Sequence, residues 1–156
     1  MADLNQMLYI LLLAMSPVVE CRGSIPFGFF AGVDLPTTFI VSLIGNVLPI
    51  PFLLVFLCKV EGLIMKRRDT NIVKRLFVRY VESLRRKSKN QLDRYGFFGL
   101  MMFVAVPLPG TGAWTSSVIA YLFGLDTKKA LMAIALGVLE ACIIVLLLVV
   151  LFGLVI

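Results

Sequence analysis

Apolar runs of two different lengths alternate along this chain, and those lengths limit what it can fold into. A helix needs about 20 residues to cross the roughly 30 Å of hydrocarbon in a bilayer. Residues Thr37–Cys58 and Ala130–Ile156 reach that length. The other apolar runs are too short to cross alone: Leu4–Val19, Phe27–Val33, Phe97–Val106 and Ala113–Leu125.

Composition places the chain in a membrane. Of its 156 residues, 60% are apolar and only 15% are charged, whereas a soluble domain carries roughly 25% charged residues. The chain has no histidine, and its three cysteines lie far apart without metal-ligand spacing. We therefore expect an integral membrane protein without a metal, a cofactor or a disulfide, and we interpret the cysteines as small apolar residues. No nucleophile–base pattern is visible, so we do not expect an enzyme.

The short apolar runs come in pairs, and each pair meets at a polar cluster containing proline and glycine. The clusters are Glu20–Pro26 and Pro107–Gly112. This pattern predicts two re-entrant hairpins, each made of two half-helices that turn back within the membrane, where irregular backbone is tolerated only if protein or a cavity surrounds it. The alternative is six ordinary tilted helices with kinks.

A shift of 92 residues superimposes the two halves of the sequence without gaps. It matches Pro17 with Pro109, Ser24 with Ser116, Asp34 with Asp126, and Gly45 with Gly137. We therefore predict an all-α integral membrane protein with one transmembrane domain. It consists of two inverted-topology repeats, residues 4–58 and 95–156, each a re-entrant helical hairpin plus one transmembrane helix. A basic amphipathic helix in residues 59–94 joins them.

The net charge of +6 is concentrated in the middle of the chain. Residues 59–94 hold twelve of the fifteen Lys and Arg and four acids, and Lys128 and Lys129 add two more cations. Basic loops face the cytoplasm, so we expect these segments inside a prokaryotic inner (cytoplasmic) membrane and both termini outside. Contact with lipid headgroups explains such charge better than nucleic acid does.

Three ionisable residues lie within apolar surroundings, where each costs about 2.5–3.5 kcal/mol to insert. They are Glu20, Arg22 and Glu140. Arg22 either binds an anion or forms a structural pair with Glu20 or Glu140, and Glu140 either carries a proton or serves as the permanent partner of Arg22. Asp34 and Asp126 are expected to cap the helices that follow them.

Two half-helix N-termini are expected to converge near Arg22, and helix N-termini attract anions. Trp114 serves either packing or substrate stacking, and the glycines serve either close helix packing or anion binding. The predicted substrate-binding residues are Glu20, Arg22, Gly23, Ser24, Pro109, Gly110, Thr111, Gly112, Trp114 and Glu140.

The segments Glu20–Pro26 and Pro107–Trp114 resemble those of a prokaryotic family of small multidrug export proteins. The resemblance covers almost the whole chain. That family more distantly resembles the DedA/VTT membrane proteins, which implies two inverted re-entrant hairpins and a role in moving lipids, including polyprenyl phosphates, between leaflets, with suspected proton coupling. It gives Glu20 and Arg22 the hairpin-tip roles. The second tip departs from that pattern, because the positions matching Glu20 and Arg22 hold Gly112 and Trp114.

The leading functional hypothesis is a small transporter or lipid translocase that binds an anionic headgroup, such as a lipid phosphate, between the hairpin tips. Its expected partners are membrane lipids, an anionic lipid or small molecule, and a second copy in a homodimer. One alternative is proton-coupled export of small lipophilic cationic drugs. Another is a non-transporting membrane scaffold that recruits partners through the basic helix.

Overall fold

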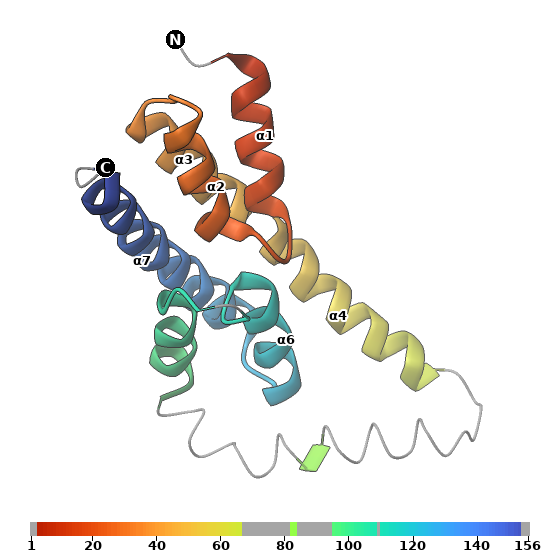
Figure 1. The fold of residues 1–156 in the computed structure, drawn as a ribbon. Coiled ribbons are helices and arrows are strands. Elements are labelled where there is room, and N and C mark those ends of the chain that lie inside the picture. The colour runs from red at the N-terminus through yellow and green to blue at the C-terminus, as the bar shows by residue number, and fades with distance from the viewer. Residues whose placement is uncertain (1–2, 67–81, 84–94, 109, 154–156) are drawn as a thin grey trace.

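The computed structural model describes residues 3–66, 82–83, 95–108 and 110–153. Within these residues the regular secondary structure is helical, and there is no strand. This agrees with the predicted all-α class. The elements, shown in Figure 1, are α1 (Leu4–Met15), α2 (Glu20–Phe30), α3 (Leu35–Val47), α4 (Pro49–Lys66), a helix over Tyr95–Ala105, α6 (Ala113–Phe123) and α7 (Thr127–Gly153). Most of the predicted basic amphipathic helix lies outside the described residues.

Two stretches are long and apolar enough to cross a membrane. They are Leu35–Val60, with a mean hydropathy of 2.4, and Thr127–Gly153, with a mean hydropathy of 3.1. Both fall where the run lengths predicted them. The first is interrupted at Leu48, between α3 and α4. Pro49 and Pro51 have no N–H to donate to the preceding turn, which explains the break.

The shorter helices form two pairs. The turn Ser16–Val19 joins α1 to α2, and residues 106–112 join the Tyr95–Ala105 helix to α6. The start of α2 refines the prediction for the polar cluster Glu20–Pro26, in which the half-helix was expected to begin after Arg22, at Gly23. In the structure this cluster is helical, with Pro26 inside α2. The cluster can form a helix because its polar side chains find partners on other elements, as described below.

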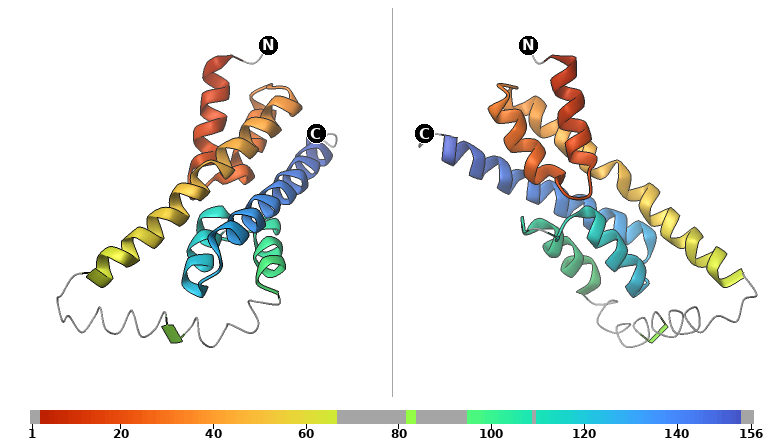
Figure 2. Two further views of the ribbon diagram at one scale, coloured as in Figure 1. Left: turned by 180° about the vertical axis from the view of Figure 1, so that it is seen from behind. Right: turned by 45° about the vertical axis from the view of Figure 1, so that its right-hand side comes forward.

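The helices give the molecule two opposite ends. The N-terminal end of α1 and the C-terminal end of α7 lie at one end, and the C-terminal end of α4 and the start of α7 lie at the other (Figures 1 and 2). The turns of the two helix pairs meet between these ends. The inverted repeat and the re-entrant placement of the pairs stay predictions.

Each long stretch has a glycine at which the first helix of the same half packs closely. An ideal Cβ on Gly45 would lie 2.8 Å from the Cβ of Ala14 in α1, and one on Gly137 would lie 2.6 Å from the Cβ of Val104. Small residues permit such close helix approach. The two glycines that match under the 92-residue shift therefore make corresponding contacts.

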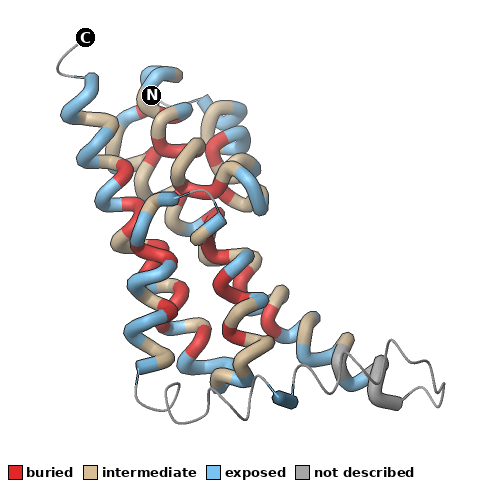
Figure 3. The backbone as a smooth tube through the Cα atoms, turned by 60° about the horizontal axis from the view of Figure 1, so that its bottom comes forward, coloured by how far each residue is buried: buried red, intermediate tan, exposed pale blue. Residues whose placement is uncertain are grey.

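Buried residues follow the helix faces turned toward one another, and the outer faces are exposed (Figure 3). The outer faces carry large apolar side chains, among them Leu4 at 82% exposure and Phe30 at 76%. Apolar residues in such numbers on an outer surface match a lipid environment better than water. Both predicted aspartate caps are present: Asp34 accepts from Thr37 N–H at 3.0 Å, and Asp126 accepts from the N–H groups of Lys128 and Lys129.

Candidate functional site

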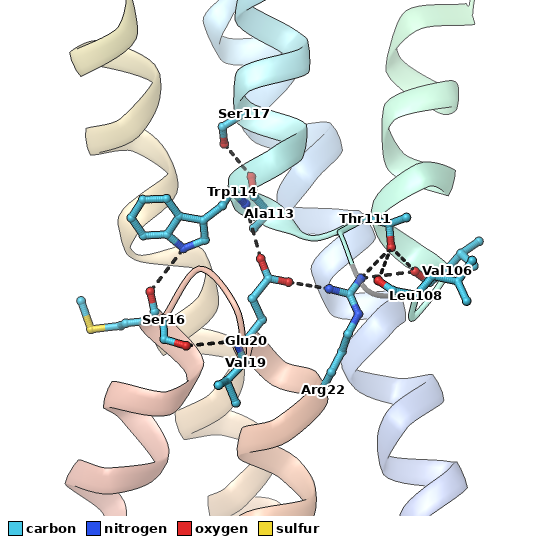
Figure 4. A network of polar contacts seen from close by, with 11 residues as sticks. Ser16, Val19, Glu20, Arg22, Val106, Leu108, Thr111, Ala113, Trp114 and Ser117 are labelled. Carbon is cyan, nitrogen blue, oxygen red and sulfur yellow. Dashed lines mark hydrogen bonds and ion pairs between the residues drawn. The ribbon is translucent and has the colours of Figure 1, made fainter.

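The candidate site lies where the turns of the two helix pairs meet, and Glu20 is its centre (Figure 4). Glu20 has φ 52°, a left-handed conformation that is uncommon for a residue with a side chain. From this sharp turn the carboxylate reaches the start of α6, where Oε1 accepts from Trp114 N–H at 3.5 Å and faces the N–H of Ala113. Only 3% of Glu20 is exposed.

Gly112 explains why α6 needs a carboxylate from elsewhere. It is the N-cap of α6 and has no side chain with which to cap the helix. A Cβ at this position would overlap the carboxylate of Glu20. Glu20 therefore occupies the space that a side chain would fill and satisfies N–H groups that the helix start leaves free.

Arg22 binds the second helix pair at its other break, the C-terminal end of the Tyr95–Ala105 helix. Its Nη1 donates to Glu20 Oε2 at 2.6 Å, and its Nη2 donates to Thr111 Oγ1 at 2.9 Å and to the carbonyl of Val106 at 3.2 Å. Val106 directly follows the Tyr95–Ala105 helix. A cation thus lies at the negative end of one helix and an anion at the positive end of the next, as helix dipoles favour.

Further contacts hold the two turns together. The hydroxyl of Thr111 lies 2.6 Å from the carbonyl of Val106 and 2.9 Å from that of Leu108. The indole Nε1 of Trp114 donates to the carbonyl of Met15, at the end of α1, at 3.2 Å. Trp114 thus anchors one turn to the other.

The structure brings together five of the predicted site residues: Glu20, Arg22, Thr111, Gly112 and Trp114. Ser24 lies deeper in α2, where its Oγ donates to Ser42 Oγ at 2.8 Å. Gly23 packs against the side chain of Val19, and Gly110 supplies a turn at φ 87°. Pro109 lies outside the described residues.

Glu140 does not join this cluster. It is half-buried on α7, and within the part of the chain that the structure describes it has no hydrogen bond or ion pair. Of the two predicted partners of Arg22, the structure selects Glu20. The described residues contain no group of three His, Cys, Asp or Glu side chains that could hold a metal ion.

Sequence reasoning missed two features of the interior. Cys21 and Cys142 were interpreted as separate apolar residues, yet their buried thiols interact with each other, and Cys21 also interacts with Asn46. Thr38, Ser42 and Asn46 follow at intervals of four in α3, and all three are buried. That spacing places them on one helix face and was a readable signal.

An apolar cavity of about 360 Å³ opens beside Arg22. One wall comes from Pro26 and Phe30 of α2, and the facing wall comes from α7, with Val145, Val149 and Phe152 among its lining residues. Because Arg22, Pro26 and Phe30 are four residues apart, the guanidinium and the apolar wall belong to one stripe of α2. The site therefore combines a cation with an adjacent apolar groove.

The comparisons with known proteins agree with a membrane protein of this kind. No curated protein and no solved structure matches the chain significantly. The sequence model of one family, described as "Putative small multi-drug export protein", matches residues 20–144, a stretch that includes Glu20, Arg22 and the second turn. Because this match covers most of the chain, the protein belongs to that family of small export-type membrane proteins.

Proposed function

We propose that this protein is a small membrane transporter that moves an amphipathic anion, such as a lipid phosphate, and that Arg22 binds the anionic group. In this proposal the two helix pairs are re-entrant hairpins of inverted repeats. The first enters from the outer side of the membrane and the second from the cytoplasmic side. Their turns would then form the substrate site at the middle of the bilayer.

The observation that carries the proposal is that a carboxylate of the chain itself already occupies an anion site. Glu20 is held by a guanidinium at 2.6 Å and by N–H groups at the start of α6. These are the groups that bind phosphate and carboxylate ligands in other proteins. A substrate anion that replaced Glu20 would satisfy the same donors, so the exchange would leave the start of α6 capped throughout.

The same geometry provides a means of coupling to protons. A protonated Glu20 carries no charge and is a weaker partner for Arg22 than the carboxylate is. Protonation would release Arg22 and the α6 N–H groups, and the substrate anion would take their place. Deprotonation would let Glu20 compete again and expel the substrate. Proton and anion would then move in the same direction.

The apolar groove beside Arg22 points to the class of anion. A hydrophilic anion would gain nothing from walls formed by Pro26, Phe30 and Val149. An acyl or prenyl chain can lie against these walls without leaving apolar surroundings, because lipid tails are as apolar as the side chains that line the groove. A lipid phosphate thus matches both the cation and the groove, and it would reach the groove sideways from the bilayer.

Flux of a lipid phosphate bearing a fluorescent label on its acyl chain, measured in proteoliposomes by quenching of the outer leaflet, tests this function. We expect Arg22→Gln to abolish the movement of the labelled lipid. Lys128→Gln is the matched control, because it removes an exposed cation at the start of α7, outside the contacts of the site, and it should leave the flux unchanged. Equal flux in both variants and the wild type would refute the assignment.

The family description favours a second candidate, the export of small lipophilic cations. Glu20 would then bind a proton and a cationic drug in turn. The close pairing of Glu20 with Arg22 disfavours this, because a guanidinium at 2.6 Å competes with the drug. Drug-resistance growth assays separate the candidates: cation export requires Glu20 and tolerates Arg22→Gln, whereas anion transport requires Arg22.

We further propose that the protein lies in the prokaryotic cytoplasmic membrane as a homodimer, with its basic residues inside. Lys128 and Lys129 are exposed at the start of α7, at the same end of the molecule as the C-terminal end of α4 (Figure 1). This gathering of cations at one end supports the orientation. Labelling of single cysteines introduced at residues 3 and 128 from each side of intact cells tests it.

A further inference from the structure

The interface between α2 and α3 contains a line of buried polar side chains. Thr38, Ser42 and Asn46 occupy one face of α3 and are each at most 1% exposed. Across the interface, Ser24 hydrogen-bonds to Ser42, and Cys21 interacts with Asn46. We call these residues (Ser24, Thr38, Ser42 and Asn46) the polar seam. It runs along α3 from Thr38, in the first turn of the helix, to Asn46, which interacts with Cys21, the residue next to Glu20.

Two oxygens in the polar seam have no hydrogen-bond partner within the described part of the chain. They are Thr38 Oγ1 and Asn46 Oδ1. A buried oxygen left without a partner destabilises a fold by about 1–3 kcal/mol. Ordered water commonly satisfies such groups in proteins. The pattern therefore points to water as the ligand of this seam.

The second half of the chain provides an internal comparison. Under the 92-residue shift, Thr38, Ser42 and Asn46 correspond to Ala130, Ile134 and Val138, which are buried in α7. Helix α6 packs on α7 there, as α2 packs on α3. The α7 side of that interface is apolar at these three positions, although Ser116 of α6 is also buried, so helix packing alone does not require polar residues at the matching positions of α3.

We propose that the polar seam holds water molecules and carries protons between the exposed Asp34 end of α3 and Glu20. Four residues of helix rise about 6 Å, and two hydrogen bonds of about 2.8 Å through one water span nearly the same distance. Each hydroxyl and each water accepts one proton and passes one on, whereas the amide of Asn46 carries no proton and only holds a water through Oδ1. Glu20 gains the proton that enters at the Asp34 end.

The proposal rests on the proposed function only in taking Glu20 as the group that receives the proton. Among the described residues, the titratable or charged groups that face Glu20 are Arg22 and Cys21 of α2 and Cys142 of α7. Helix α6 contributes backbone N–H groups to it. Because the positions of α7 that correspond to Thr38, Ser42 and Asn46 are apolar, the relay reaches Glu20 from one end of the molecule only.

The chain contains its own reporter for this reaction. Trp114 is its single tryptophan, and its backbone N–H binds the carboxylate of Glu20. We would mix the detergent-solubilised full chain rapidly with acidic buffer and follow tryptophan fluorescence. Glu20→Gln should abolish the fluorescence change, which establishes what the signal reports. A wild-type signal that persists in Glu20→Gln would overturn the proposal.

The decisive variants remove hydroxyls while keeping shape. Thr38→Val and Ser42→Ala should slow the fluorescence change about tenfold or more, because a barrier raised by about 1.4 kcal/mol slows a step tenfold. The final amplitude should stay the same. Ser116→Ala is the matched control, because Ser116 Oγ is also buried and unpartnered but belongs to the other half. Its rate should be that of the wild type.

Wild-type rates in both Thr38→Val and Ser42→Ala would overturn the proposal, and so would equal slowing by Ser116→Ala. Should either seam variant fail to fold, as judged by circular dichroism, Ser24→Ala supplies the same test from α2. Failure of lipid flux together with seam-dependent protonation would refute the proposed substrate alone, so the two proposals fail separately.

Discussion

Adding a single methyl group at Gly112 is expected to disrupt the contact between the two turns. The Cβ of Gly112→Ala would overlap the carboxylate of Glu20, so the carboxylate must leave its place at the start of α6. Helix α6 then loses the only acceptor identified at its N-cap among the described residues, and Arg22 loses its ion-pair partner.

The magnitude follows from these two losses. Loss of a helix cap costs about 1 kcal/mol. Breaking a fully buried ion pair costs about 3–5 kcal/mol, but Arg22 keeps two oxygen acceptors and 17% of its side chain is exposed. We therefore assign about 2 kcal/mol to the ion pair, for a total near 3 kcal/mol.

Unfolding by sodium dodecyl sulfate in mixed micelles, followed by circular dichroism, measures this loss. Gly99→Ala is the matched control, since its Cβ would meet no atom within 4 Å, and it should retain or slightly raise stability. In a Glu20→Ala background, Gly112→Ala should cost little, because the obstructing carboxylate is gone. An equal cost of Gly112→Ala in both backgrounds would refute this account of the contact.

Three further predictions concern the contacts around the site. Hydrogen bonds from the Thr37 hydroxyl and N–H lower the pKa of Asp34 below 3.8. The cap that Asp34 provides should therefore be complete above pH 3.8 and weaken as the pH falls through the folded-state pKa. Asp34→Asn caps the helix without titrating, so the melting curves of this variant and the wild type should converge only at acidic pH. Trp114→Phe removes the bond to the carbonyl of Met15 and should lower the free energy of unfolding by about 1 kcal/mol, whereas an unchanged value would mean that the indole N–H has no structural role. Gly45→Ala overpacks the contact with α1 and should cost about 1–3 kcal/mol in the same unfolding assay.

Run lengths and helix punctuation predicted much of this fold. The two long stretches, the caps at Asp34 and Asp126 and the start of α6 after Gly112 follow from local rules. The helix start at Glu20, ahead of Gly23, did not, because the polar side chains in this cluster are satisfied by residues distant in sequence, such as Thr111 for Arg22 and Ser42 for Ser24. A local pattern cannot reveal partners that only the packed helices bring close.

The sequence predicted which charged residues belong to the site better than it predicted which of them meet. Glu20 and Arg22 stood out because charges in an apolar run are costly, and the structure pairs them. Glu140 stood out for the same reason, but contact between helices depends on how each is rotated and how deeply it lies. The face of α7 that includes Gly137, Val138 and Cys142 turns inward, and Glu140 lies beside it, only half-buried.

The meeting of Glu20 with Gly112 bears on how two such halves can share one chain. These residues are 92 positions apart, so each is the counterpart of the other under the predicted duplication. Two identical halves would bring two carboxylates together, and at about 4 Å their repulsion would approach 4 kcal/mol near a protein surface. A fused duplicate escapes that repulsion, since one copy can keep the acid while the other shrinks to glycine. Divergence between the copies is therefore a condition for this contact, which a symmetric pair of separate half-length chains could not form.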